Sequence, residues 1–176
     1  MNSQLIIRNI GRFVLLMLLQ VLVFNNVYLG GYINPCLYVL FIAMLPTNMG
    51  RIPMMLTAFF TGLCIDITTN MAGFHTFACT AVGYLRGVWL DKIITRDNEE
   101  GIDMPCIYNG SYQQFSLYLM LLLLVFNLIY HTLLAFSLHD IFNILLTALL
   151  STIVTWLLAI LYQTLLLRNT KNKNKA

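Results

Sequence analysis

Asp66 is the only carboxylate that lies well inside an apolar stretch of this sequence, and His75 is the nearest residue that could pair with it. A carboxylate and an imidazole within hydrogen-bonding distance can bind a polar ligand or pass a proton. Burying a charge in a membrane costs at least about 2.5–3.5 kcal/mol, so Asp66 needs a partner or water. Because no second carboxylate accompanies the pair, we interpret it as a polar bridge that fixes the register of two helices. A ligand or proton site is the alternative.

Small and polar residues recur every four positions on both sides of this pair. One set is Ala58, Gly62, Asp66 and Asn70, and the other is His75, Cys79, Gly83 and Gly87. Residues four apart share a helix face, and small residues on that face let two helices approach closely. We therefore expect two antiparallel helices with Asp66 opposite His75. The spacing of Gly83 and Gly87 also occurs in helix dimers, but we favour packing within the chain.

Other reactive groups give weaker signals. The sequence has no H-E-x-x-H, no G-x-S-x-G and no glycine-rich phosphate loop, and an aspartyl protease would need a second carboxylate at the depth of Asp66. The cysteines form no C-x-x-C pair and have no histidine at ligand spacing, which predicts neither a disulfide nor a metal site. They are Cys36, Cys64, Cys79 and Cys106. We expect no catalysis and no cofactor.

Asn127, Tyr130 and His131 should form hydrogen bonds between helices, and Arg86 should reach outward to the membrane surface.

The elements that position these residues follow from the composition. Of 176 residues, 59% are hydrophobic and only 10% are charged, and the mean hydropathy is +0.78. Soluble domains carry about a quarter charged residues. Lys, Arg, Asp and Glu are missing from 13–50, 104–139 and 141–167, and about 20 apolar residues suffice to cross a bilayer. The sequence therefore predicts an all-α, polytopic membrane helix bundle, a single integral membrane domain over 1–176.

About six transmembrane helices fit this pattern. Their expected ranges are 13–29, 34–46, 53–69, 74–90, 115–136 and 141–167. Asn34 is suited to cap the second helix and Pro35 to be its first helical residue. Asp140 can cap the last one.

The basic residues predict the orientation of the bundle. With six crossings, all ten Lys and Arg residues fall on one side, and positive residues in short loops mark the cytoplasm. They are Arg8, Arg12, Arg51, Arg86, Lys92, Arg96, Arg168, Lys171, Lys173 and Lys175. Both termini are therefore expected in the cytoplasm. The net charge of +3 reflects these loops and the tail, and does not indicate nucleic-acid binding.

Two local segments carry a family resemblance. The segment 31–42 reads GYINPCLYVLFI, and 62–66 reads GLCID and is followed at 73–75 by GFH. Together with the six-span plan, they resemble the rod shape-determining protein MreD family, in the version seen in Bacteroides-like bacteria. The resemblance implies a multi-pass protein of the bacterial inner membrane that pairs with the single-span protein MreC. It also implies regulation of the polymerase and transpeptidase that build the lateral peptidoglycan wall.

The same resemblance implies a fold similar to the substrate-binding S components of energy-coupling-factor vitamin transporters. A small-molecule-binding S component is therefore the alternative function, with Asp66, His75 and Asn127 as possible cavity groups. The acidic run 97–100 matches no feature of the MreD family, so the resemblance says nothing about the role of the segment 91–114.

Overall fold

The computed structural model describes residues 3–26, 33–47, 49–93, 112–135 and 141–173. Every regular element in these ranges is helical. In chain order they are α1 (Ser3–Leu22), the short 3-10 helix η1 (Phe24–Asn26), α2 (Val39–Ala43), α3 (Arg51–Thr69), α4 (Phe74–Ile93), α5 (Tyr112–Ala135) and α6 (Ile141–Lys173). The chain is thus an all-α helix bundle, as its composition predicts.

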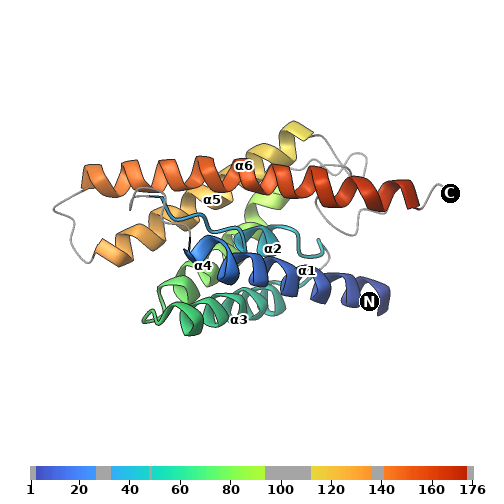
Figure 1. The fold of residues 1–176 in the computed structure, drawn as a ribbon, viewed down its shortest axis with the longest axis horizontal. Coiled ribbons are helices and arrows are strands. Elements are labelled where there is room, and N and C mark those ends of the chain that lie inside the picture. The colour runs from blue at the N-terminus through green and yellow to red at the C-terminus, as the bar shows by residue number, and fades with distance from the viewer. Residues whose placement is uncertain (1–2, 27–32, 48, 94–111, 136–140, 174–176) are drawn as a thin grey trace.

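The long helices lie alongside one another; α1 and α3 run in the same direction, and α4, α5 and α6 each reverse the direction of the helix before (Figure 1). The short helix α2 lies in the middle of the bundle. On either side of it, α4 packs against both α3 and α5, and α5 packs against α6. The start of α1 and the end of α6 lie at the same end of the molecule (Figure 1).

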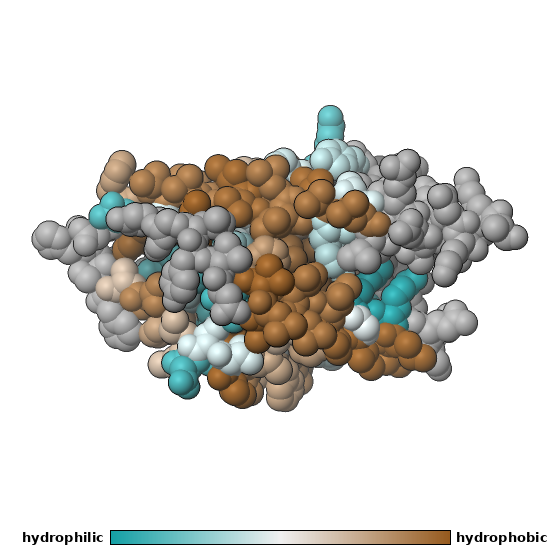
Figure 2. All heavy atoms as spheres, viewed as in Figure 1, coloured by the Kyte–Doolittle hydropathy of each residue, from teal (hydrophilic) through white to brown (hydrophobic). Residues whose placement is uncertain are grey.

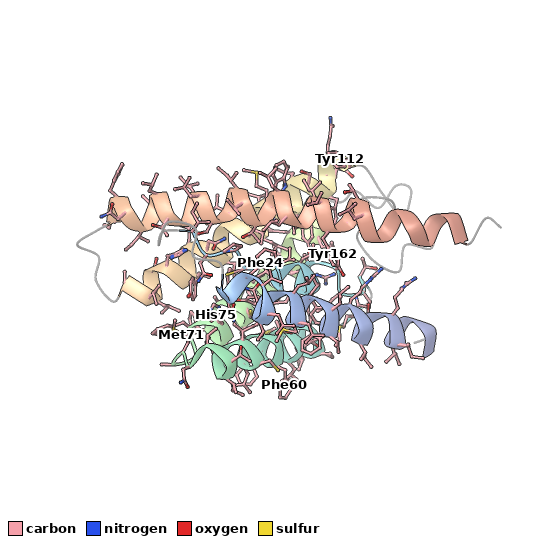
Figure 3. The ribbon with its side chains drawn as sticks, viewed as in Figure 1. Phe24, Phe60, Met71, His75, Tyr112 and Tyr162 are labelled. Carbon is pink, nitrogen blue, oxygen red and sulfur yellow. The ribbon has the colours of Figure 1, made fainter. Side chains whose placement is uncertain are left out.

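The surface of the bundle differs from that of a water-soluble helix bundle, because large apolar side chains face outward while several polar side chains are buried beside the apolar core. On α6, the outward residues include Leu145, Leu149, Ile153 and Leu157, while Ser151, Thr152, Thr155 and Gln163 are buried. Large apolar side chains also cover the outer faces of α1 and α3, and the surface view is brown over most of its described part (Figure 2). Phe60, for example, projects outward from α3 (Figure 3). A helix in water turns its apolar stripe inward, so this surface is suited to lipid.

Among the helices that the structure describes, three are long and apolar enough to cross a membrane. They are Arg51–Thr69, Tyr112–Ala135 and the Ile141–Leu165 part of α6.

The expected helix over 34–46 is wrong. Only Val39–Ala43 is helical, and Asn34 and Pro35 lie in irregular backbone ahead of it, where neither can act as a helix cap or as a first helical residue. The first helix also differs, because it begins at Ser3 rather than near Phe13 and so takes Arg8 and Arg12 into its first three turns. The remaining expected ranges correspond to α3, α4, α5 and α6, with α6 continuing past 167 to Lys173.

Candidate functional site

Asp66 belongs to the last turn of α3, and its side chain lies against the N-terminus of α4. There its carboxylate accepts hydrogen bonds from residues of α4. Oδ1 accepts from the backbone N–H of His75 (3.1 Å), and Oδ2 accepts from the backbone N–H (2.8 Å) and the hydroxyl (2.5 Å) of Thr76. The first N–H groups of a helix have no partner within the helix, and a negative charge there is favourable. The carboxylate is only 4% exposed, so these bonds also replace the water it has lost.

A tight turn brings Asp66 to this position. Asn70 ends α3 in the left-handed conformation (φ 57°), and the N–H of Met71 donates to the backbone carbonyl of Asp66. Gly73 also has a positive φ, 92°, which favours glycine. Figure 3 shows Met71 and His75 near this end of α3 and α4.

The His75 side chain does not bond to the Asp66 carboxylate. Its Nδ1 is hydrogen-bonded to the Tyr38 hydroxyl (2.7 Å), and its ring stacks on Tyr130 with centroids 4.4 Å apart. The Tyr130 hydroxyl in turn accepts a hydrogen bond from Asn34 Nδ2 (3.3 Å). Asp66 and His75 therefore lie together, as expected, but their link is a carboxylate on a backbone N–H. The imidazole belongs to a separate polar and aromatic cluster, which we define as Asn34, Tyr38, His75 and Tyr130.

The irregular segment before α2 is held by side chains of α1 and α6 that no local sequence motif marks. Every residue from 35 to 46 is buried. Gln20 donates to the Pro35 carbonyl (2.9 Å) and accepts from the N–H of Leu37 (2.9 Å). Ser151 Oγ accepts from the N–H of Asn34 (3.1 Å), and Thr155 Oγ1 accepts from the N–H of Cys36 (3.2 Å). Irregular backbone away from water requires such partners.

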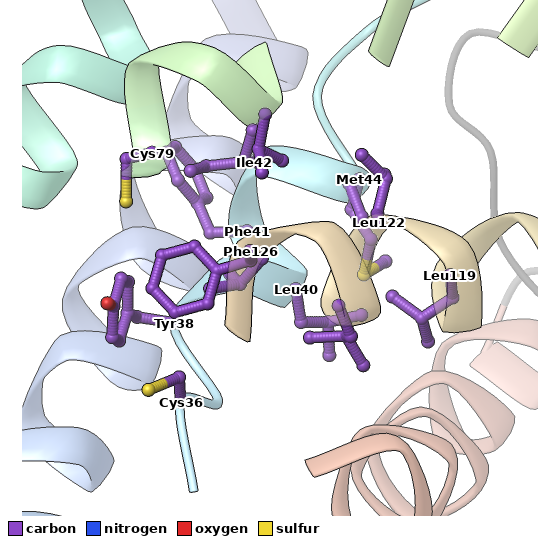
Figure 4. Packing of buried hydrophobic residues seen from close by; sticks show 14 of the residues in the cluster. Cys36, Tyr38, Leu40, Phe41, Ile42, Met44, Cys79, Leu119, Leu122 and Phe126 are labelled. Atoms are coloured by element: carbon purple, nitrogen blue, oxygen red, sulfur yellow. The ribbon is translucent and has the colours of Figure 1, made fainter. Parts of the chain in front are cut away.

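Figure 4 shows the apolar side chains of this segment packed between α4 and α5. Tyr38 and Phe126 meet edge to face, with ring centroids 5.9 Å apart. The polar bonds thus fix the backbone, and the apolar side chains of the same residues fill the middle of the bundle.

Arg86 binds the other end of α2. Its side chain is fully buried, so the expectation that it reaches outward is wrong. The guanidinium donates to the carbonyls of Ala43 (3.4 Å) and Leu45 and to Met54 Sδ (3.2 Å). The Tyr118 hydroxyl also donates to Ala43 (3.3 Å). Terminal carbonyls of a helix attract a cation, and the planar fork of Arg can reach several acceptors at once.

The glycines of the predicted stripe differ in their surroundings. A Cβ at Gly62 would lie 2.5 Å from Thr76 Cα, and a Cβ at Gly83 would lie 2.8 Å from Ala58 Cβ. These two residues therefore allow the close packing of α3 on α4, and the packing is within the chain. Gly87 has nothing within 4 Å of an added Cβ, so it does not contribute to this contact.

The remaining predicted groups are also placed. Asn127 Nδ2 donates to Thr152 Oγ1 (3.1 Å) and so forms the expected bond between helices. Cys36, Cys64 and Cys79 are free thiols, and the described residues contain no group of three His, Cys, Asp or Glu side chains that could hold a metal. Cys106, His139, Asp140, Arg96 and the acidic run 97–100 lie outside the described residues.

Comparison of the chain with protein-family models, with curated proteins and with solved structures finds no match. In the bundle, two buried charged side chains bind backbone groups of the chain itself, Asp66 at the start of α4 and Arg86 at the end of α2.

Proposed function

We propose that this chain is a non-catalytic component of the bacterial inner membrane that serves the cell-elongation machinery. In this proposal it pairs with an MreC-like single-span protein and helps to regulate the enzymes that synthesise lateral peptidoglycan. The observation that carries the proposal is the use of Asp66 and Arg86 to bind backbone groups. Because these charged groups already bind backbone, they stabilise the fold and are not available for a reaction, which suits a scaffold better than an enzyme.

The outer surface supports the pairing. Because the exposed faces of α1, α3 and α6 are apolar, lipid or the transmembrane helix of another protein can cover them. The resemblance of 31–42 and 62–66 to the MreD family suggests which protein would supply this transmembrane helix, namely an MreC-like partner. The irregular path of 33–38 falls inside the first of those segments.

The proposed orientation has both termini in the cytoplasm. The start of α1 and the end of α6 lie at one end of the bundle, and Arg51 lies at the start of α3, which runs in the same direction as α1 (Figure 1). Asp66 and His75 lie toward the opposite end, which would face the periplasm. The rule that short basic loops stay in the cytoplasm supports this orientation.

Affinity purification in a mild detergent tests the pairing. An epitope-tagged chain should recover an MreC-like protein and wall-synthesis enzymes, and depletion should make rod-shaped cells round. A Gly62→Leu variant is the matched control, because a misfolded bundle should lose the partner. Repeated purification of the intact chain without any such partner would contradict the proposal.

A second candidate is a small-molecule-binding S component of a vitamin transporter. The observation that favours it is the cluster Asn34, Tyr38, His75 and Tyr130, in which the last three are buried and which brings hydroxyl, amide and imidazole groups together. A vitamin bound there would raise the unfolding temperature of the purified chain. Copurification with a pair of energising ATPases would also favour this candidate, and the absence of both effects across the vitamins tested would eliminate it.

A further inference from the structure

Three buried side-chain atoms have no hydrogen-bond partner among the described residues. They are Asn127 Oδ1, His131 Nε2 and Trp156 Nε1. All three belong to α5 and α6. A buried polar atom without a partner costs about 1–3 kcal/mol, and such atoms in a native fold are commonly satisfied by a bound water molecule. The interface between α5 and α6 is therefore the place to look for a ligand that the protein holds internally.

The orientation of the Asn127 amide is fixed by its neighbours. The side chain is fully buried, and Nδ2 donates to the carbonyl of Leu123 (2.9 Å) and to Thr152 Oγ1 (3.1 Å). The Thr152 hydroxyl is already a donor to the Ala148 carbonyl (2.7 Å). Turning the amide over would set Oδ1 against the Leu123 carbonyl, which is also an acceptor. Oδ1 therefore needs a donor that does not come from these neighbours.

His131 lies one helical turn beyond Asn127 on the same face of α5. It is 7% exposed, and its ring packs edge-on against Tyr130 with centroids 5.1 Å apart. In neutral imidazole, Nε2 is either a donor or an acceptor, so a molecule that can both donate and accept satisfies either form. Trp156 follows Thr152 by one turn of α6, and because α5 and α6 are antiparallel it lies on the side of Asn127 away from His131.

We propose that a water molecule occupies a polar site beside α5 and bridges Asn127 Oδ1 and His131 Nε2. The water donates one hydrogen to Oδ1 and completes its second bond with Nε2, as donor or as acceptor. Internal waters require at least two polar partners, and these two residues supply them. The site goes beyond the proposed function, because it makes the α5–α6 region a hydrated polar interface rather than a dry packing contact.

Solid-state NMR of the full chain in lipid bilayers tests this site. With ¹⁵N-histidine labelling the chain gives signals from three histidines, and loss of one signal in a His131→Phe variant assigns His131. Magnetisation that starts on water should reach the His131 imidazole rapidly. In Asn127→Leu, which removes the other half of the bridge, the rapid transfer should be lost, because an internal water needs at least two polar partners.

Thr132→Val is the matched control. Thr132 is next to His131 but exposed, and its hydroxyl donates to the Leu128 carbonyl of its own helix (2.7 Å), so the transfer to His131 should not change. Slow transfer to His131 in the unmodified chain would overturn the proposal, whatever happens in the variants. Equal rates in the unmodified chain and in a folded Asn127→Leu variant would overturn it as well.

Discussion

Asp66 and Arg86 show how single residues support this bundle. Each uses its side chain to form hydrogen bonds with the backbone of another element. The carboxylate holds the first N–H groups of α4, and the guanidinium holds carbonyls at the end of α2. In an apolar environment water is not available to replace either set of bonds. The stability of the bundle should therefore depend on these two side chains, and the dependence can be measured.

Replacing Asp66 should destabilise the protein. In Asp66→Ala, the N–H groups of His75 and Thr76 lose their acceptor, at a cost of about 1–3 kcal/mol for each unsatisfied group. Thermal unfolding of the purified chain in detergent measures the loss. Thr76→Val, which removes only the hydroxyl, should have a smaller effect. An Asp66→Ala protein that unfolds at the original temperature would show that the carboxylate does not hold α4.

The identity of the cation at position 86 should matter as much as its charge. Lysine is a point charge and cannot present a planar fork to Ala43 and Leu45 together, so Arg86→Lys should cost about 1.5–3 kcal/mol. The same exchange at Arg51, which is exposed, should stay within about 0.5 kcal/mol. Chemical unfolding of both variants checks the difference, and equal stabilities would contradict the role of Arg86.

At the scale of elements, α3 and α4 form the closest helix pair around the candidate site. Gly62 lies against the backbone of α4 near Thr76, and Gly83 lies against Ala58 of α3. Close approach at these points positions the Asp66 carboxylate over the start of α4. The packing of the pair and the hydrogen bonds of Asp66 thus depend on each other.

Adding a single methyl group at Gly62 or at Gly87 should change the stability of the protein differently, because the surroundings of the two glycines differ. In Gly62→Ala, the new Cβ would lie 2.5 Å from Thr76 Cα, so α3 and α4 must move apart and stability should fall by about 1–3 kcal/mol. In Gly87→Ala, the Cβ meets open space, and the better helix propensity of alanine makes the change neutral or favourable by up to about 1 kcal/mol. Unfolding temperatures that fall equally in the two variants would contradict this account.

The irregular segment before α2 depends on hydroxyl groups of α6. Thr155→Val leaves the Cys36 N–H without an acceptor and should cost about 1–3 kcal/mol. Thr164→Val is the control, since the Thr164 hydroxyl is exposed and bonds only to its own helix, at Leu161. Denaturant unfolding compares them. If both variants behave like the unmodified chain, the α6 hydroxyl does not support the segment.

For the whole molecule, the important feature is an outer surface rich in large apolar side chains, with several polar side chains buried beside the apolar core. Ser151, Thr152, Thr155 and Gln163 are buried while the leucines of α6 face outward. Such a surface suits a lipid or detergent environment. In the proposed membrane setting, the orientation of the bundle determines which end partners can reach.

Labelling of single cysteines should report that orientation. Ala72→Cys places an exposed thiol between α3 and α4, and a membrane-impermeant maleimide should modify it in intact cells stripped of their outer membrane. Arg51→Cys, exposed at the start of α3, should react only after the inner membrane is opened. The unmodified chain controls for its own cysteines. Labelling in the reverse order would contradict the proposed cytoplasmic termini.

The sequence alone predicted much of the bundle, because the signals for α3, α4, α5 and α6 are local. Apolar runs of sufficient length, interrupted by turns such as the one at Asn70 and Gly73, mark these helices directly. Spacing by four placed Gly62 and Asp66 on one face. The same spacing also predicted a helix contact for Gly87, and this prediction is wrong. Spacing along one helix does not reveal whether another helix lies opposite.

By itself, therefore, the sequence determined the helical class, the apolar exterior and the pairing of α3 with α4, all of which depend on nearby residues. Only the tertiary structure decided that the chain is irregular from Asn34 to Leu37. The acceptors for those N–H groups come from residues 17 positions away for Gln20, and 117 and 119 positions away for Ser151 and Thr155. Arg86 likewise reaches carbonyls 41 and 43 positions away. Bonds between such distant residues leave no local pattern, because they form only after the bundle has assembled.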